Sequence, residues 1–300
     1  ARAHLTPQGV FGEYNYYREQ WLVDRLAGTL QAAYGLLPCE DTTGEQSKLA
    51  LLMASSDPAA LRCPQVWHPP TATNLPTPAT DDYPFLYLRE RGIPGFYLLT
   101  IALILLASLI LVRAGSGSLM LMRPYLDLFF MGAAFLLLET KNVVQFALLF
   151  GTTWFVNALV FIGILTAVLA AIEVARRLHW SDPRFLYLAL LAALAGAWAV
   201  PPHLLLGLDL VPRFVAAVLL AFIPIFIANL VFAQRFKSVG SSTVAFGANL
   251  LGAMIGGLLE YSSLVLGYRS LLIIIALLYG LAFAFGSRAS SAASTVTTTA

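Results

Sequence analysis

Charged residues are scarce in this 300-residue sequence: Asp, Glu, Lys and Arg make up 11% of it, whereas soluble domains carry about 25%. This shortage excludes a water-soluble globule as the main body of the protein. An intrinsically disordered chain is also excluded, because disorder needs low hydrophobicity and 59% of these residues are hydrophobic. The formal net charge of +2 is too small to indicate a nucleic-acid partner.

Residues that could hold a metal ion or a nucleotide are also few. Cys39 and Cys63 are the only cysteines, and neither a CxxC motif nor a matching histidine spacing predicts a zinc site. Two free thiols are the simpler interpretation, and a disulfide is the alternative if this part of the chain faces an oxidising compartment. The segment GVFG at residues 9–12 has the wrong spacing for a dinucleotide-binding loop. The sequence therefore predicts no metal site and no cofactor-binding residue in this chain, and it assigns no catalytic residue.

The sequence divides into a polar N-terminal part and an apolar remainder. Residues 1–93 hold 7 basic and 10 acidic residues, a net charge of −3, and residues 94–300 hold 11 and 6, a net charge of +5. The chain starts at Ala1 without an initiator methionine or an apolar leader. We therefore expect this chain to be a fragment of a longer polypeptide. The upstream part of that polypeptide is then an expected partner of this chain.

The N-terminal part has the pattern of an incomplete α/β domain over residues 1–64. A short buried strand is expected at residues 9–14 and a second at residues 49–54. Between them, apolar residues at a helical period predict an amphipathic helix at residues 17–34, which Gly35 terminates. Two strands are too few for an independent sheet, so the rest of the sheet is expected upstream.

The apolar remainder has the pattern of a membrane domain. A proline-rich linker is expected at residues 65–93, the membrane domain at residues 94–286, and a disordered Ser/Thr/Ala-rich tail at residues 287–300. A membrane-spanning helix needs about 20 apolar residues. Seven segments meet or approach this length: residues 94–113, 126–149, 155–174, 185–200, 211–232, 243–267 and 271–285. The predicted fold class is therefore an α-helical polytopic membrane protein with about seven transmembrane helices, preceded by an incomplete α/β fragment.

Basic residues in the loops between these spans indicate an orientation, because Lys and Arg are enriched in cytoplasmic loops. One side of the bilayer collects eight basic residues and the other side four. The eight are Arg113, Arg123, Arg176, Arg177, Arg184, Arg235, Lys237 and Arg288, and the four are Arg89, Arg91, Arg213 and Arg269. A multi-pass protein of the cell (inner) membrane is predicted, in contact with the lipid bilayer, with its N-terminal part outside the cytoplasm.

Polar side chains inside the predicted spans are the candidate functional residues, because ionised groups at bilayer depth are rare. The second span carries Glu139, Lys141 and Asn142. At 100° per residue Lys141 and Asn142 share a face, whereas Glu139 lies opposite Lys141, so the two charges cannot pair within the helix. Each then needs a partner on another helix, or water. Asn157 of the third span is expected to bind a neighbouring helix.

The sixth predicted span has a stripe of small and polar residues. Gly252 and Gly256 form a GxxxG pair, which lets another backbone approach closely, and Asn249 and Glu260 lie on the same stripe. This face should therefore pack against another helix. We expect Glu260 to pair with Lys141, either as a structural salt bridge or as part of a proton, ion or substrate site.

Several strings in the sequence carry a resemblance to a known family. They are YNYYR at residues 14–18 with GLLP at 35–38, TDDYPFLY at 80–87, FLLLETK at 135–141, LFGTTWFVN at 149–157 and NLLGAMIGGLLEY at 249–261. Together they resemble the C-terminal part of bacterial membrane proteins identified as spermidine-synthase-like. In that family a Rossmann-type methyltransferase domain precedes several membrane spans.

The resemblance implies that residues 1–64 are the last strands and helix of a Rossmann-like, methyltransferase-like domain. It also implies an S-adenosylmethionine-type cofactor, bound by a Gly-rich loop that this chain lacks. The cofactor would therefore belong to the upstream part, and this fragment would not itself catalyse aminopropyl or methyl transfer.

Three functions fit the sequence. The first is a membrane domain that anchors a transferase-type head and handles its substrate, such as a cationic polyamine attracted by Glu139 and Glu260. The second is a transporter or ion-coupled protein with a buried site at Glu139, Lys141 and Glu260. The third is a structural membrane scaffold.

Overall fold

The computed structural model describes residues 2, 5–16, 19–42, 49–71, 77–178 and 183–297, with only the backbone described for Asn15 and residues 287–297. The chain forms two compact units, Ala1–Gly92 and Ile93–Ala300. Each unit has a hydrophobic core of its own.

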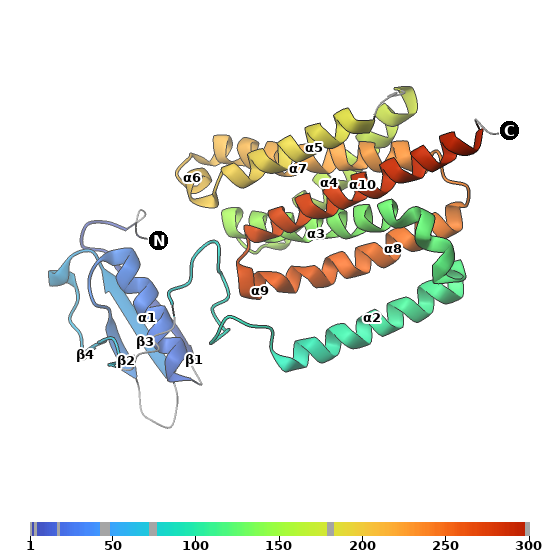
Figure 1. Cartoon of the computed structure of the whole chain (residues 1–300). Coiled ribbons are helices and arrows are strands. Elements are labelled where there is room, and N and C mark those ends of the chain that lie inside the picture. The colour runs from blue at the N-terminus through green and yellow to red at the C-terminus, as the bar shows by residue number, and fades with distance from the viewer. Residues whose placement is uncertain are drawn as a thin grey trace. The chain divides into compact units, whose positions relative to one another are not determined.

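The first unit contains a four-stranded sheet with a helix on one face (Figure 1). The strands are β1 (Val10–Tyr16), β2 (Cys39–Thr42), β3 (Leu49–Ser55) and β4 (Gln65–Val66). Their order is β1-β3-β2-β4, and every neighbouring pair is antiparallel. Alternate residues of β3, Ala50, Leu52 and Ala54, are buried beneath α1 (Gln20–Tyr34), as expected for a strand covered on one face.

The predicted helix and both predicted strands are present. α1 ends at the predicted stop: Gly35 has a φ of 82°, a left-handed conformation that glycine adopts without strain, and its N–H donates to the carbonyl of Gln31. Residues 17–18, where the helix was predicted to begin, lie outside the described residues.

The sheet differs from the prediction in two respects. β1 was predicted to be buried, but it is an edge strand, and Tyr14 and Tyr16 are 77% and 69% exposed. The short strands β2 and β4 were missed, because one is acidic and the other lies in a proline-rich segment. The antiparallel pairing does not confirm a Rossmann-like domain, whose sheet is mostly parallel, although such sheets can carry antiparallel edge strands.

Residues 65–92 belong to the first unit rather than to a separate linker. Trp67 and Tyr83 are buried, and the Trp67 indole donates to Asp24 Oδ1 over 3.0 Å. The guanidinium of Arg25 on α1 is also buried and donates to four backbone carbonyls between Phe85 and Arg89. Residues 72–76 of the predicted linker lie outside the described residues.

A disulfide joins Cys39 of β2 to Cys63, with 5.2 Å between their Cα atoms. The interpretation of two free thiols was therefore wrong. The bridge closes a loop that contains β3, one of the two inner strands of the sheet, so it joins the chain segment before β3 to the segment after it.

The second unit is helical (Figure 1). Its elements in chain order are α2 (Gly95–Ser116), a 3-10 helix (Leu119–Tyr125), α3 (Leu126–Phe150), α4 (Trp154–Arg177), α5 (Pro183–Ala199), α6 (Pro202–Leu206), α7 (Leu210–Phe236), α8 (Ser242–Leu259), a 3-10 turn (Glu260–Ser262), α9 (Ser263–Leu266) and α10 (Ser270–Thr297). α10 continues through residues predicted to form a disordered tail, of which 298–300 lie outside the described residues.

Among the described residues, five helices are long and apolar enough to cross a membrane, rather than about seven. These are Gly95–Ser116, Leu119–Phe150, Trp154–Arg177, Leu210–Phe236 and Ser242–Leu266. The other two predicted spans form shorter apolar helices, Pro183–Ala199 and Ser270–Gly286. A helix of 17 residues is about 26 Å long, which is less than the hydrocarbon thickness of about 30 Å. The loop alternation used to predict the orientation is therefore not confirmed.

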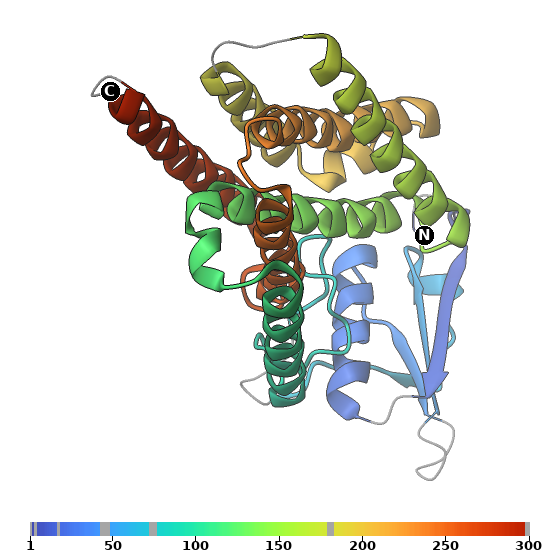
Figure 2. The ribbon, with the colours of Figure 1, turned by 90° about the vertical axis from the view of Figure 1, so that its right-hand side faces the viewer.

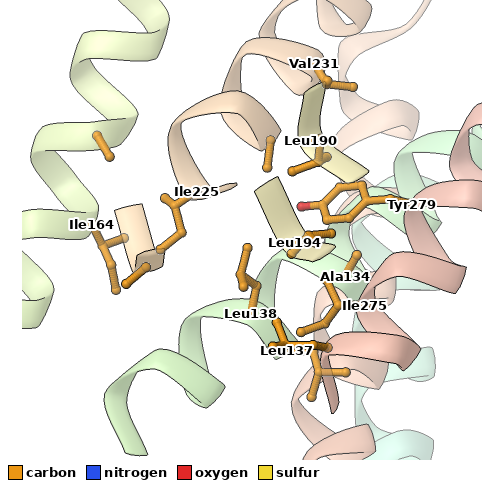
Figure 3. Close-up of a cluster of buried hydrophobic side chains, with 14 of the residues drawn as sticks. Ala134, Leu137, Leu138, Ile164, Leu190, Leu194, Ile225, Val231, Ile275 and Tyr279 are labelled. Atoms are coloured by element: carbon orange, nitrogen blue, oxygen red, sulfur yellow. The ribbon is translucent and has the colours of Figure 1, made fainter. Parts of the chain in front are cut away.

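α3 is the central helix of the second unit. It packs most extensively on α8 and α10 and also contacts α4 and α7 (Figure 1 and Figure 2). Its apolar face carries Ala134, Leu137 and Leu138, which lie among side chains of α4, α5, α7 and α10 in Figure 3. The residues that surround α3 thus come from segments far apart in the sequence.

The predicted small-residue face of α8 packs against α3. A Cβ at Gly252 would overlap with the carbonyl oxygen of Phe129, and a Cβ at Gly256 would overlap with that of Ala133. On α3, a Cβ at Gly132 would meet the backbone of Asn249. The two backbones are therefore in direct contact, as the GxxxG pair predicts.

Replacing Gly252 by Ala should lower the thermal stability of the protein in detergent. The new methyl group would overlap with α3 backbone and push the helices apart, at a cost of about 1–3 kcal/mol. The matched control is Gly196→Ala on α5, where a Cβ would meet nothing within 4 Å. The control should leave the melting temperature unchanged or raise it, because alanine favours helices. Equal effects of the two substitutions would contradict the close packing.

Candidate functional site

Lys141, Asn142 and Gln145 are buried polar residues of α3, and Lys141 and Asn142 lie on the face that the sequence analysis assigns to both. The Lys141 ammonium donates to the Gln145 side-chain oxygen one turn further on. The Asn142 amide donates to the carbonyl of Ala221 on α7 over 3.4 Å. Pro224, three residues further along α7, lacks the N–H that would otherwise bond the carbonyl of Leu220, the neighbour of Ala221.

The predicted pair between Lys141 and Glu260 does not form. In the described part of the chain the ion pairs join Glu173 to Arg176 and Arg177, and Asp127 to Arg235. Glu260 is half-buried and lies near the side chain of Thr140, the residue before Lys141, whose hydroxyl donates to the carbonyl of Leu137 over 3.1 Å. Glu139 is half-buried too. Helical periodicity gave the face of each helix on which these residues lie, but not which side chains meet across the two helices.

A 3-10 turn interrupts the α-helical hydrogen bonding of the sixth predicted span beside this part of α3. α8 ends at Leu259, Glu260 begins the 3-10 turn, and α9 ends at Leu266, followed by Gly267 with a φ of 87°. The next residue, Tyr268, is buried, and its hydroxyl donates to the carbonyls of Thr140 and Lys141 on α3. We call Thr140, Lys141, Glu260 and Tyr268 the helix-break site.

Asn249 and Asn157 do not belong to the helix-break site. The Asn249 amide donates to the carbonyl of Leu128 over 3.0 Å, near the start of α3. Thirteen residues of helix separate Leu128 from Lys141, which corresponds to about 20 Å. Asn157 is half-buried in the first turn of α4. The predicted candidates therefore fall into separate places, and Asn249 contributes to the contact between α3 and α8.

Asp127 and Arg235 form a buried ion pair that the sequence analysis missed. Asp127 lies in the first turn of α3 and is 1% exposed, and Arg235 lies in the last turn of α7. Each charge complements the dipole of its own helix, because anions are stabilised at helix N-termini and cations at C-termini. The sequence did carry a signal for this pair: one apolar helix has an acidic residue in its first turn, and another has a basic residue in its last turn. Tyr187 of α5 interacts electrostatically with both partners.

An apolar groove of about 470 Å³ lies between α4 and α7 and is separate from these polar groups. Its lining includes Phe146, Phe214, Phe222 and Phe226, with Thr166 as the polar side chain. The groove therefore offers almost no hydrogen-bonding group to a polar ligand, and the polar chemistry of the bundle lies on α3.

Comparison with known proteins assigns no family: none of the protein-family models, curated proteins or solved structures compared with the chain matches it. Within the described residues, no group of three or more His, Cys, Asp or Glu side chains could hold a metal ion. The roles of the polar residues therefore rest on their geometry.

Replacing Asp127 by Asn should destabilise the protein much more than replacing Lys141 by Met. Asp127→Asn leaves the Arg235 charge in a partly buried position without its counter-charge, which costs about 3 kcal/mol. Lys141→Met removes a buried charge whose partner, Gln145, is neutral. The free energy of unfolding should therefore stay within about 1 kcal/mol of the wild-type value, or exceed it. Thermal unfolding in detergent measures both. A larger loss for Lys141→Met would contradict this assignment.

Proposed function

We propose that the chain is the membrane part of a spermidine-synthase-like protein and that it holds a transferase-type head at the cell membrane. The observation that carries this proposal is the pairing of five apolar, membrane-length helices with a separate α/β unit that has its own core and disulfide. The resemblance of the sequence supports the identity of the head. An S-adenosylmethionine-type cofactor would bind to the upstream part, and the lipid bilayer would surround the second unit.

The Cys39–Cys63 disulfide supports an orientation with the first unit outside the cytoplasm of an inner-membrane protein. Disulfides form and persist in oxidising compartments and are rare in the cytosol.

Fractionation and thiol labelling test the anchor and its orientation together. The chain expressed in bacterial cells should stay in the membrane pellet after alkaline carbonate extraction. In intact spheroplasts, both cysteines should react with a membrane-impermeant maleimide only after a membrane-impermeant reductant is added. The double variant Cys39→Ser/Cys63→Ser is the unlabelled control. Release by carbonate would refute the anchor, and labelling only after lysis would refute the orientation.

The helix-break site supports a second function, the binding and transport of a cation such as a polyamine. Interrupted membrane helices form substrate and ion sites in many transporters, and here a 3-10 turn inside the span Ser242–Leu266 carries Glu260, near Thr140. A 3-10 segment within a helix commonly marks a functional hinge. Glu260 and Glu139 supply negative charge at this level of α3.

Uptake of radiolabelled spermidine by proteoliposomes of the whole chain tests the second function. Wild-type protein should accumulate the label, and Glu260→Gln should abolish the uptake, because a neutral amide keeps the shape of the site but removes its charge. Glu90→Gln in the first unit is the matched control and should transport like the wild type. Uptake that survives Glu260→Gln would exclude the site.

A further inference from the structure

The apolar groove between α4 and α7, which we call the α4–α7 groove, is lined almost entirely by hydrocarbon. Thr166 supplies its hydroxyl group, but that hydroxyl donates to the carbonyl of Ile162 within α4 over 2.7 Å. The lining therefore presents carbon to a bound molecule, and the volume of about 470 Å³ is large enough for a ligand. The ligand class that fits such a lining is a hydrocarbon chain.

The mouth of the α4–α7 groove faces away from the core of the bundle. Three residues of its lining are strongly exposed: Ile162 (60%), Leu219 (51%) and Ile223 (46%). On the inner side, Ile164 of α4 lies beside Ile225 of α7, and both are buried (Figure 3). Both helices are long and apolar enough to cross a membrane. In a bilayer the mouth would therefore open onto acyl chains.

The C-terminal ends of α4 and α7 are bound to each other. The side-chain amide of Gln234 donates to the carbonyl of Leu178 over 3.0 Å, and the Lys237 ammonium donates to the carbonyl of Ala175. The two helices therefore run in the same direction and end on the same side of the bilayer.

Positive charge is in excess at these joined ends. The charged residues there are Glu173, Arg176, Arg177 and Lys237, together with Arg235, which pairs with Asp127. Glu173 is the acidic partner of both arginines of α4, and the ammonium of Lys237 lies at the carbonyl next to them. Arg176, Arg177 and Lys237 are exposed. Exposed Lys and Arg at the membrane surface attract anionic lipid headgroups.

One face of α4 connects the groove to these charges. Its groove-lining residues recur every three or four positions, as on one helix face: Leu159, Gly163, Thr166 and Ala170. The same spacing continues to Glu173 and Arg177. Eleven residues of helix separate Thr166 from Arg177, which corresponds to about 17 Å. Half of the hydrocarbon thickness is about 15 Å, so an acyl chain whose headgroup lies at Arg177 reaches the level of Thr166.

We propose that the α4–α7 groove binds one acyl chain of an anionic phospholipid whose phosphate is held by Arg177 and Lys237. The phosphate oxygens accept hydrogen bonds from the guanidinium and ammonium groups, which are the usual phosphate-binding side chains. The chain then lies along α4 and contacts the phenylalanines of α7 that line the groove, Phe222 and Phe226.

The lipid site rests on the membrane location in the first proposed function, and it requires neither the transferase-type head nor cation transport. Carbonate extraction tests the membrane location separately. A chain that stays in the membrane pellet but shows no preferred lipid would therefore refute the lipid site alone.

Photochemical labelling of the whole chain in phosphatidylcholine proteoliposomes tests the site. A small fraction of phosphatidylglycerol carries a diazirine near the end of one acyl chain, and mass spectrometry of proteolytic peptides locates the adducts after illumination. Adducts should concentrate on residues 159–170 and 214–226. The same diazirine chain on phosphatidylcholine should label these residues several-fold less. Labelling spread evenly over the lipid-facing helices, or equal labelling by the two headgroups, would overturn the proposal.

Arg177→Gln tests the headgroup contact. It should lower labelling of the groove by phosphatidylglycerol about fivefold, because each Lys or Arg near the surface adds attraction for an anionic headgroup. The matched control is Arg113→Gln, which removes an exposed arginine from the last turn of α2 and should label like the wild type. Equal labelling of the Arg177→Gln variant and its control would contradict the phosphate contact.

Ala170→Phe tests the groove itself. The added ring should fill the groove and reduce its labelling several-fold, whereas Ala102→Phe on α2 should leave the labelling unchanged. Both alanines are exposed, so neither variant should lower the melting temperature in detergent. Unchanged labelling in Ala170→Phe, or an equal loss in both variants, would refute binding in the groove, and Arg177→Gln decides independently if Ala170→Phe fails to fold.

Discussion

The direct contact between the backbones of α3 and α8 is the constraint on which the membrane unit depends. Gly132, Gly252 and Gly256 bring the two helices together without intervening side chains. This packing sets α3 at the centre, where α10, α4 and α7 can also reach it. In lipid, where apolar burial adds little between helices, close van der Waals packing of this kind is a main source of helix association.

The central position of α3 also explains where the polar groups lie. A helix enclosed by neighbours on several sides can carry charged side chains that lipid-facing helices cannot. α2 illustrates the contrast, since only Ser108 and Val112 are buried on it, and its one charged residue, Arg113, lies in its last turn. The helix-break site and the Asp127–Arg235 pair each join polar residues of α3 to polar residues of a neighbouring segment.

Local patterns predicted much of the fold, whereas tertiary partners were not predictable. Apolar length located the membrane helices, Gly35 located the end of α1, and the GxxxG pair identified the packing face of α8. The pairing of Lys141 was predicted incorrectly, because helical periodicity gives the face on which a side chain lies but not its partner on another helix or its rotamer. Strand β2, the disulfide and the Asp127–Arg235 pair depend on contacts between residues distant in sequence, which periodicity does not encode.

The separation in sequence between α3 and its partners has a consequence for biogenesis. Asp127 has no counter-charge until Arg235 is synthesised, 108 residues later. The carbonyl of Leu128 has no donor from α8 until Asn249 is synthesised, 121 residues later. A charge at the centre of an isolated helix opposes insertion by about 2.5–3.5 kcal/mol, and α3 carries Glu139 and Lys141 in its middle. Lateral release of α3 from the insertion machinery should therefore be delayed until α7 and α8 have emerged from the ribosome.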